Sequence, residues 1–443
     1  MRALITSSIL LLASAAQATT FPFPMQSETL PSGLRVVTVP MDSPGLFAYF
    51  TLVRVGSRNE VEPGHTGFAH FFEHMMFRGT ERFPAERQAQ LTRDLGLHSN
   101  AFTWDDETVY FYAGPKTALP QVIEMEADRF QHLKYAKEAF QTEAKAVLGE
   151  YNKDFADPAM KMEEALLDRA FVRHTYKHTT IGVLADVLKM PEQYDYSLQF
   201  FRRFYRPDNC TLFVIGDFDR AAVLKTIRAE YGAWRGHAEP AAVPIEPPQT
   251  QERSATVDWP SQAKPRVLVG WHTPEAGTQA AAVQKVLGPY LFGEASPLYR
   301  ELVLERQLVE SFEVAYLDDD RPGHRDPRLF YYQATAKRPN DLPAVMAAVD
   351  RAIAALANGQ VNAQLLSDVK RHLRYGLLTS LETPTRVGEF LSLVVAPTGD
   401  LGALDRLFDQ MAGVTPAALS SFAQQYLVPT HRTTVTLMVK EKK

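Results

Sequence analysis

The stretch His70-Phe71-Phe72-Glu73-His74 constrains this chain more than any other. No glycine or proline interrupts residues 68–77, so the stretch is predicted to be helical. On a helix, His70 and His74 lie on one face because they are four residues apart, and Glu73 lies beside them. Two imidazoles next to a carboxylate are typical of a hydrolytic zinc site. The alternative is two histidines on an ordinary core helix, which is disfavoured because burying three ionisable groups without a partner is costly.

The first 18 residues have the pattern of an export signal. Arg2 provides the positive end, and residues 4–16 form an apolar run too short to span a bilayer. Ala16-Gln17-Ala18 offers a small-x-small cleavage site, so the mature chain is predicted to begin at Thr19. No later stretch is apolar for long enough to cross a membrane. We therefore expect an exported protein without a membrane span, which in a bacterium means the periplasm.

The composition excludes some partners. Lys and Arg number 47 and Asp and Glu number 52, and the net charge of -5 gives no reason to expect nucleic acid or an anionic membrane as a partner. The single cysteine, Cys210, excludes an internal disulfide. It lies in an apolar run and is expected to be a small buried side chain.

A proline-rich stretch divides the chain. Residues 237–256 are predicted to be a semi-extended linker, because prolines recur there and almost no hydrophobic periodicity is present. Residues 19–236 and 257–443 echo each other, with similar motifs recurring in the same order at offsets of 220 to 223 residues. In both parts, short β-branched and aromatic runs alternate with longer helical stretches. We therefore predict an α+β fold of two duplicated domains, each a sheet covered by helices.

A metal ion held by only two histidines needs a third protein ligand. The predicted helix over residues 137–154 carries two candidates, Glu143 and Glu150. They are seven residues apart and so lie on the same side of that helix. Taken alone, this pair is more typical of a solvated helix face.

Together these motifs resemble the insulinase/pitrilysin family of zinc peptidases, which includes mitochondrial and bacterial processing peptidases. That family carries H-x-x-E-H, the inverzincin signature, and about 75 residues later a helix with an E-x6-E pair. The resemblance implies that Glu150 is the third ligand of one Zn²⁺ per chain and that Glu143 helps to orient the site. It also implies two homologous domains with mainly antiparallel sheets. Only the first is expected to bind metal, since residues 291–296, at the duplicated position, contain no histidine.

The resemblance extends to residues 96–103, which match a family segment ending in N-A-x-T. In the family, the Asn-Ala-aromatic strand is a sheet edge to which the substrate adds as a further strand. Asn100, Ala101 and Phe102 are therefore expected to bind the substrate backbone. An ordinary hairpin strand is the alternative.

A second histidine pair is a weaker candidate for a metal site. His174 and His178 are also four residues apart, but no acid stands at a useful spacing from them. In the family this segment is a structural loop, and that role is expected here.

The second half departs from the family at two positions. Catalytic relatives carry an Arg and, further along, a Tyr that grip the substrate and stabilise the developing oxyanion. The matching positions are Val303 and Glu310, which cannot do that work. Arg300 or Arg306 could substitute. The expected arrangement is instead a heterodimer in which a homologous subunit supplies the Arg/Tyr pair, with a homodimer as the second option.

The predicted function is that of a zinc-dependent endopeptidase acting on unfolded peptides or oligopeptides, with a metal-activated water and Glu73 as general base. Two alternatives are a catalytically silent scaffold of the same fold and a peptide-binding subunit with a structural metal. The intact Glu73 argues against the first, because a silent subunit needs no base. A structural zinc site usually has four protein ligands, and no further Cys or His is placed to complete one.

Overall fold

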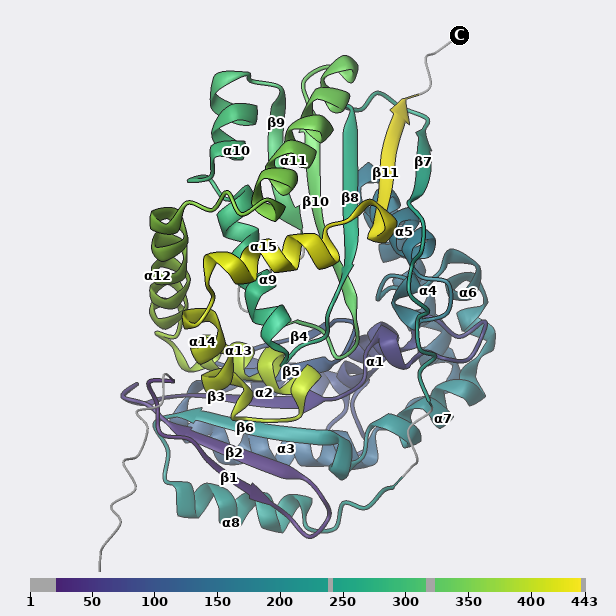
Figure 1. The fold of residues 1–443 in the computed structure, drawn as a ribbon. Coiled ribbons are helices and arrows are strands. Elements are labelled where there is room, and N and C mark those ends of the chain that lie inside the picture. Colours follow the sequence, from purple (N-terminus) through teal and green to yellow (C-terminus); the bar gives the residue numbers. More distant parts are fainter. Residues whose placement is uncertain (1–20, 238–241, 316–322, 440–443) are drawn as a thin grey trace, which may run out of the picture.

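Two sheets organise the chain (Figure 1). The computed structural model describes residues 21–237, 242–315 and 323–439. Within these residues, the first sheet has the strand order β1-β2-β6-β3-β5-β4 and the second has the order β7-β11-β8-β10-β9. The first sheet comprises β1 (Gln26–Thr29), β2 (Arg35–Pro40), β3 (Leu46–Val53), β4 (His98–Thr103), β5 (Thr108–Pro115) and β6 (Cys210–Gly216). The second comprises β7 (Arg253–Trp259), β8 (Arg266–Thr273), β9 (Val309–Ala315), β10 (Arg328–Ala336) and β11 (Arg432–Val439).

The two sheets repeat one topology. Each strand in the order β2-β6-β3-β5-β4 has a counterpart in the order β7-β11-β8-β10-β9, and β1 is an addition at one edge. In each copy one neighbouring pair is parallel, β2 with β6 and β7 with β11. The other pairs formed by the described strands are antiparallel. This confirms the predicted α+β fold of two duplicated, mainly antiparallel domains.

Helices from the same half cover one face of each sheet. The helices of the first half are α1 (Phe68–Met75), α2 (Ala85–Asp94), α3 (Leu119–His132), α4 (Lys137–Asp154), α5 (Pro158–Ala170), α6 (Leu184–Lys189), α7 (Tyr194–Phe204) and α8 (Arg220–Tyr231). Those of the second half are α9 (Gln279–Phe292), α10 (Pro297–Tyr299), α11 (Leu342–Ala357), α12 (Ala363–Ser380), α13 (Pro384–Thr398), α14 (Ala403–Ala412) and α15 (Pro416–Tyr426). In both cores, aliphatic and aromatic side chains of the helices pack on the inward side chains of the strands.

The opposite face of each sheet is covered by a helix from the other half. α13 packs on β3 and β6, where Leu391 and Val394 join Phe50 and Phe213 in one apolar cluster. α5 packs in the same way on β7 and β11, and Leu166 belongs to that cluster. The predicted domains thus correspond to the two sheets, but each half completes the core of the other.

The predicted linker is too long at its C-terminal end. Residues 242–252 contain no helix or strand, but β7 begins at Arg253, so residues 253–256 belong to the second sheet. The parallel pairing of β7 with β11 is a long-range contact that decides this boundary. The predicted signal peptide, residues 1–18, and residues 238–241 of the linker lie outside the described residues.

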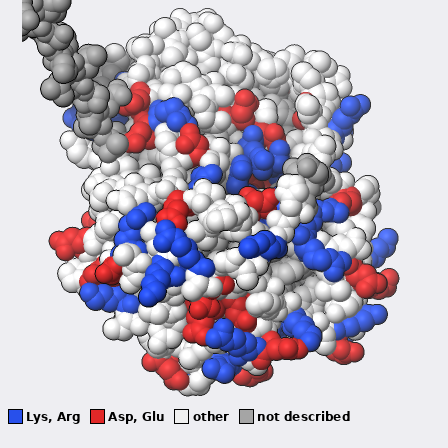
Figure 2. Space-filling model, turned by 90° about the horizontal axis from the view of Figure 1, so that it is seen from below, with Lys and Arg blue, Asp and Glu red and all other residues white. Residues whose placement is uncertain are grey.

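Figure 2 shows Lys and Arg side chains interspersed with Asp and Glu side chains over the face seen from below. Among the described residues, no single helix combines the length and the apolar composition of a membrane span. α13 and α14 meet both criteria only as a pair, and they are bent by 89° at the break between them. Both helices contribute buried side chains to the apolar cluster on the first sheet.

Gly388 lies where α13 approaches β3 closely. A Cβ at this position would lie 2.2 Å from Cε2 of Phe50, which no real contact allows. Gly388→Ala is therefore expected to displace α13 and to lower the free energy of unfolding by about 1–3 kcal/mol, measured by urea denaturation. Gly376→Ala on α12 is the matched control, because nothing lies within 4 Å of a Cβ there and alanine favours a helix. Equal destabilisation of the two variants would contradict this packing.

Asp326 joins the second half to the first. Its carboxylate forms an ion pair with Arg58 and accepts a hydrogen bond from His174 Nε2 at 3.0 Å. Burial raises the pKa of Asp326, but the hydrogen bonds from His174 and Arg58 outweigh it and hold the pKa at about 2. An unfolded Asp has a pKa of about 3.9, so this carboxylate stabilises the fold above that pH. The contribution is lost as the pH falls towards 2.

Asp326→Asn is accordingly expected to be less stable than the wild-type chain at pH 6, with roughly half of the difference gone by pH 3. Urea denaturation of both proteins over this pH range measures the difference. A stability difference that stays constant down to pH 3 would contradict the ion-pair assignment.

Candidate metal centre

Helix α1 carries the predicted metal-binding motif. It begins after Gly67, whose φ of +89° is a conformation that favours glycine. The Glu60 carboxylate accepts hydrogen bonds from the backbone N–H groups of Gly67 and Ala69 at 2.8 and 2.7 Å. These are donors at the helix start that have no partner within the helix. The apolar side chains of α1 are buried in the core, whereas the two histidines and the glutamate of the motif are half-buried. The spacing of apolar and polar residues along α1 therefore places His70, Glu73 and His74 on the side of the helix that faces away from the core.

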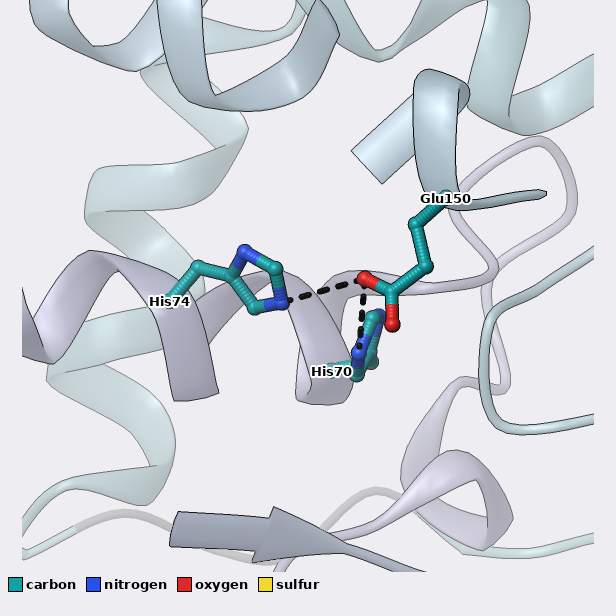
Figure 3. A group of neighbouring side chains, drawn as sticks. All are labelled: His70, His74 and Glu150. Atoms are coloured by element: carbon teal, nitrogen blue, oxygen red, sulfur yellow. Dashed lines mark ion pairs between the residues drawn. The ribbon is translucent and has the colours of Figure 1, made fainter. Parts of the chain in front are cut away.

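Three side chains from two helices converge at one point (Figure 3). Oε2 of Glu150, on α4, lies 3.7 Å from Nε2 of His70 and 3.4 Å from Nε2 of His74. Ligands held tetrahedrally by zinc at about 2.1 Å are about 3.4 Å apart, so these two distances are close to those of a zinc site. All three ligand atoms lie within 4.8 Å of one another. No fourth His, Cys, Asp or Glu of the described residues joins the group. A three-ligand site of this kind keeps a coordination position for water or substrate.

The protonation state of His70 and the orientation of His74 suit metal binding. Burial, and to a lesser extent the charge of His74, lowers the pKa of His70 to about 3, so this ring is neutral and free to donate a lone pair. Nδ1 of His74 is hydrogen-bonded to Oε1 of Glu143 at 2.9 Å, and Arg78 pairs with the other oxygen of Glu143. This contact directs Nε2 of His74 towards Glu150, which is the orienting arrangement expected from the sequence.

Glu73 lies beside the three ligands without being one of them. It lines a cavity of about 290 Å³ together with His74, Phe77, Arg78 and Glu143. Burial raises the pKa of Glu73, while the hydrogen bond from Thr103 and the charge of His74 lower it. A partly buried carboxylate with a raised pKa at the rim of a metal site is placed to accept and return a proton.

Thr103 is a site residue that the sequence analysis did not single out. Its Oγ1 donates a hydrogen bond to Oε2 of Glu73 at 2.8 Å, so the last residue of β4 orients the carboxylate. The only available signal was its place at the end of the N-A-x-T segment.

The predicted substrate strand is β4. It lies at the edge of the first sheet and pairs only with β5 among the described strands. Ala101 belongs to the core beneath α1, and Phe102 packs against the cluster on the opposite face. The edge position of Asn100, Ala101 and Phe102 is as expected, and their role in binding a substrate stays a prediction.

The two positions of the missing Arg/Tyr pair lie in the second half. Val303 packs against the core of that half within a π-helical segment, residues 300–305. Glu310 lies on β9 and forms an ion pair with Lys264. Arg306 forms an ion pair with Glu301 at 2.7 Å, and Arg300 is exposed.

Three other reactive side chains, those of His174, His178 and Cys210, are buried outside the metal centre. His174 is buried and bonds to Asp326, and Nδ1 of His178 lies 3.0 Å from the carbonyl oxygen of Thr179. Cys210 is buried on β6, as predicted, and burial raises the pKa of its thiol.

Comparisons with known proteins agree with this geometry. Residues 42–183 match the insulinase (peptidase family M16) domain, and residues 193–373 match the domain described as the peptidase M16 inactive domain. The chain therefore belongs to the insulinase, or M16, family. The first match includes α1 and α4, and the description of the second agrees with a metal centre in the first half.

Individual relatives extend this likeness over the whole chain. The zinc protease PqqE of Helicobacter pylori is 26% identical over an alignment of 448 positions that covers 97% of this chain and 97% of that protein. A protease of Helicobacter pylori of known structure has a TM-score of 0.86 at 25% identity and covers 94% of this chain and 99% of that one. The periplasmic protease PqqL of Escherichia coli shares the fold, with a TM-score of 0.73 at 20% identity, and the match covers 47% of that longer chain.

Proposed function

We propose that this chain is a zinc-dependent endopeptidase that hydrolyses unfolded peptides or oligopeptides in the periplasm. The observation that carries the proposal is the convergence of His70, His74 and Glu150, with Glu73 beside them. The zinc protease names of the relatives support zinc as the metal. The description of PqqL as periplasmic supports the compartment.

Each side chain of the site has a separate role in the proposed hydrolysis. When bound, zinc supplies Lewis-acid activation of a water molecule and of the scissile carbonyl. Glu73 takes the proton of the attacking water and passes it to the leaving amine. Thr103 holds the Glu73 carboxylate, and Glu143 holds His74. The free edge of β4 pairs with an extended backbone, which selects unfolded chains and demands little of their sequence.

Thr103→Val is expected to lower kcat by about ten- to hundredfold with little change in KM, because a hydrogen bond to a charged group is worth about 1.5–3 kcal/mol. Thr103→Ser keeps the hydroxyl and should restore most of the rate. Steady-state hydrolysis of a fluorogenic peptide by the three proteins measures both constants. A Val variant with wild-type kcat would show that Glu73 needs no such support.

A partner subunit belongs to the proposal. Because Val303 and Glu310 offer no oxyanion donor, a homologous subunit would supply the Arg/Tyr pair, most simply in a heterodimer and otherwise in a homodimer. The experiment compares peptide hydrolysis by the zinc-loaded chain alone with hydrolysis by the complex co-purified from the source cell. Activity only in the complex is the expected result. Full activity of the monomeric chain would remove the partner from the proposal, and no activity in either sample would contradict the peptidase function.

A further inference from the structure

A second, larger cavity lies on the face of the first sheet opposite the metal centre. Its volume is about 1150 Å³, and it lies between the end of β4, the edge strand β9, α12 and α13. The lining residues used below are Phe102, Trp104, Glu310, Glu313, Arg386 and Glu389. Nothing in the metal site or in the proposed proton transfer uses this cavity.

The geometry of β4 connects the cavity to a bound peptide. Successive side chains of a strand point to opposite faces of its sheet, and a peptide paired with the free edge of β4 follows the same alternation. On one face its side chains lie beside Ala101 and Thr103, towards Glu73. On the other they lie beside Phe102, towards the cavity. Because the alternation continues across the scissile bond, one of the two residues flanking that bond points to the face of the sheet on which the cavity lies.

The wall of the cavity combines aromatic rings with carboxylates. Trp104 is 43% exposed, and Phe102 is half-buried. Among the described residues that line the cavity, glutamates outnumber arginines by four to one. Arg386, the arginine among these residues, is hydrogen-bonded to Glu389 at 2.9 Å, and Glu310 is paired with Lys264. Glu313 is exposed, lines the cavity and forms no ion pair with any described residue.

These surroundings discriminate between side chains. An acidic side chain would be repelled by Glu313, and an apolar one would remove water from a carboxylate without giving it a partner. A long cationic side chain suits both the aromatic rings and the carboxylates of the wall. Its apolar stem covers the rings while its charged head pairs with a carboxylate.

We infer that this cavity binds a lysine or arginine side chain of the substrate peptide, with Trp104 and Phe102 against its stem and Glu313 paired with its charge. The inference rests on the proposed peptidase function and adds the substrate class, which is unfolded peptides carrying basic residues. It also assigns Glu313, on the sheet that holds no metal, a part in specificity.

The test compares peptides that differ only by Lys, Ala or Glu at one position, scanned along an otherwise neutral sequence. Hydrolysis by the zinc-loaded complex gives kcat/KM, and binding to zinc-loaded Glu73→Gln protein is measured by fluorescence anisotropy. At one or more positions, Lys is expected to exceed Glu by about tenfold or more in both measurements. Glu313→Lys should reduce this ratio to about one or reverse it. Glu305→Lys is the matched control, because Glu305 is exposed in the same half outside the cavity wall and should keep the wild-type ratio.

The outcomes separate the two proposals. Absence of hydrolysis in every sample, with a Lys preference in binding that Glu313→Lys removes, would reject the peptidase function and keep the cavity assignment. Hydrolysis with no preference at any position, or a preference that survives Glu313→Lys, would overturn the cavity assignment and leave the peptidase function standing. Trp104→Ala gives a second readout, because it should weaken binding of the Lys peptide more than binding of the Ala peptide.

Discussion

Glu73→Gln is expected to keep its zinc and to lose turnover by about 10²–10⁴-fold. Glutamine has nearly the same shape as glutamate but cannot accept the proton of the attacking water. Glu73 is not one of the three converging ligand atoms, so metal content should not change. Zinc analysis and peptide hydrolysis of the same sample measure the two effects together.

The matched control is Glu138→Gln, which makes the same change at an exposed position on α4 outside the site. It should keep both its zinc and its rate. A Glu73→Gln enzyme as active as the control would remove the general-base role. Loss of zinc from Glu73→Gln would instead mean that this carboxylate helps to hold the metal.

Removal of zinc by a chelator is expected to reduce hydrolysis to the uncatalysed background while the chain stays folded. α1 is anchored by buried apolar side chains and by Glu60, so the metal is not needed to form this helix. The chain loses only the stabilisation due to ligand binding, about 2.7 kcal/mol when zinc is present at 100 times its Kd. Circular dichroism and activity, followed before chelation, after it and after zinc is added back, measure both properties.

Recovery of activity on adding zinc, with little change in secondary structure throughout, is the expected result. Glu150→Gln should need a much higher zinc concentration to reach a given rate, because a neutral amide replaces an anionic ligand. Unfolding on chelation, together with hydrolysis that does not depend on zinc, would support a structural metal.

Local sequence pattern was sufficient for the parts of the site that lie on single helices. The helix predicted over residues 137–154 has these same bounds as α4, and the spacing of its two glutamates places both on the side that faces α1. The H-x-x-E-H spacing likewise predicts the relative positions of His70 and His74. In both cases the information is a helical period, which a sequence carries directly.

The features missed were long-range contacts. Nothing in the pattern around Thr103 shows that its hydroxyl reaches a glutamate 30 residues earlier in the chain. The exchange of α5 and α13 between the halves was equally hidden, because an apolar helix face does not specify the sheet on which it packs. The predicted linker extended too far because the sequence of β7 shows only a weak strand pattern. This strand forms through its pairing with β11, which is distant in the sequence.

The duplication explains why the metal centre and the proposed specificity cavity lie on opposite faces of one strand. β4 faces α1 on one side, and on the other it faces β9 and α13, both from the second half. On this proposal the second half, whose described residues form no metal-binding group, still shapes what reaches the metal. Among the described strands, each sheet has one parallel pair and the two sheets share one strand order, so both halves keep the same scaffold.

The most direct test of the central claim is the position of zinc in crystals of the full chain, located by anomalous scattering at the zinc absorption edge. We predict one peak about 2.0–2.2 Å from Nε2 of His70, Nε2 of His74 and a carboxylate oxygen of Glu150. A strong zinc peak elsewhere on the chain, with none between these three side chains, would contradict the proposed centre.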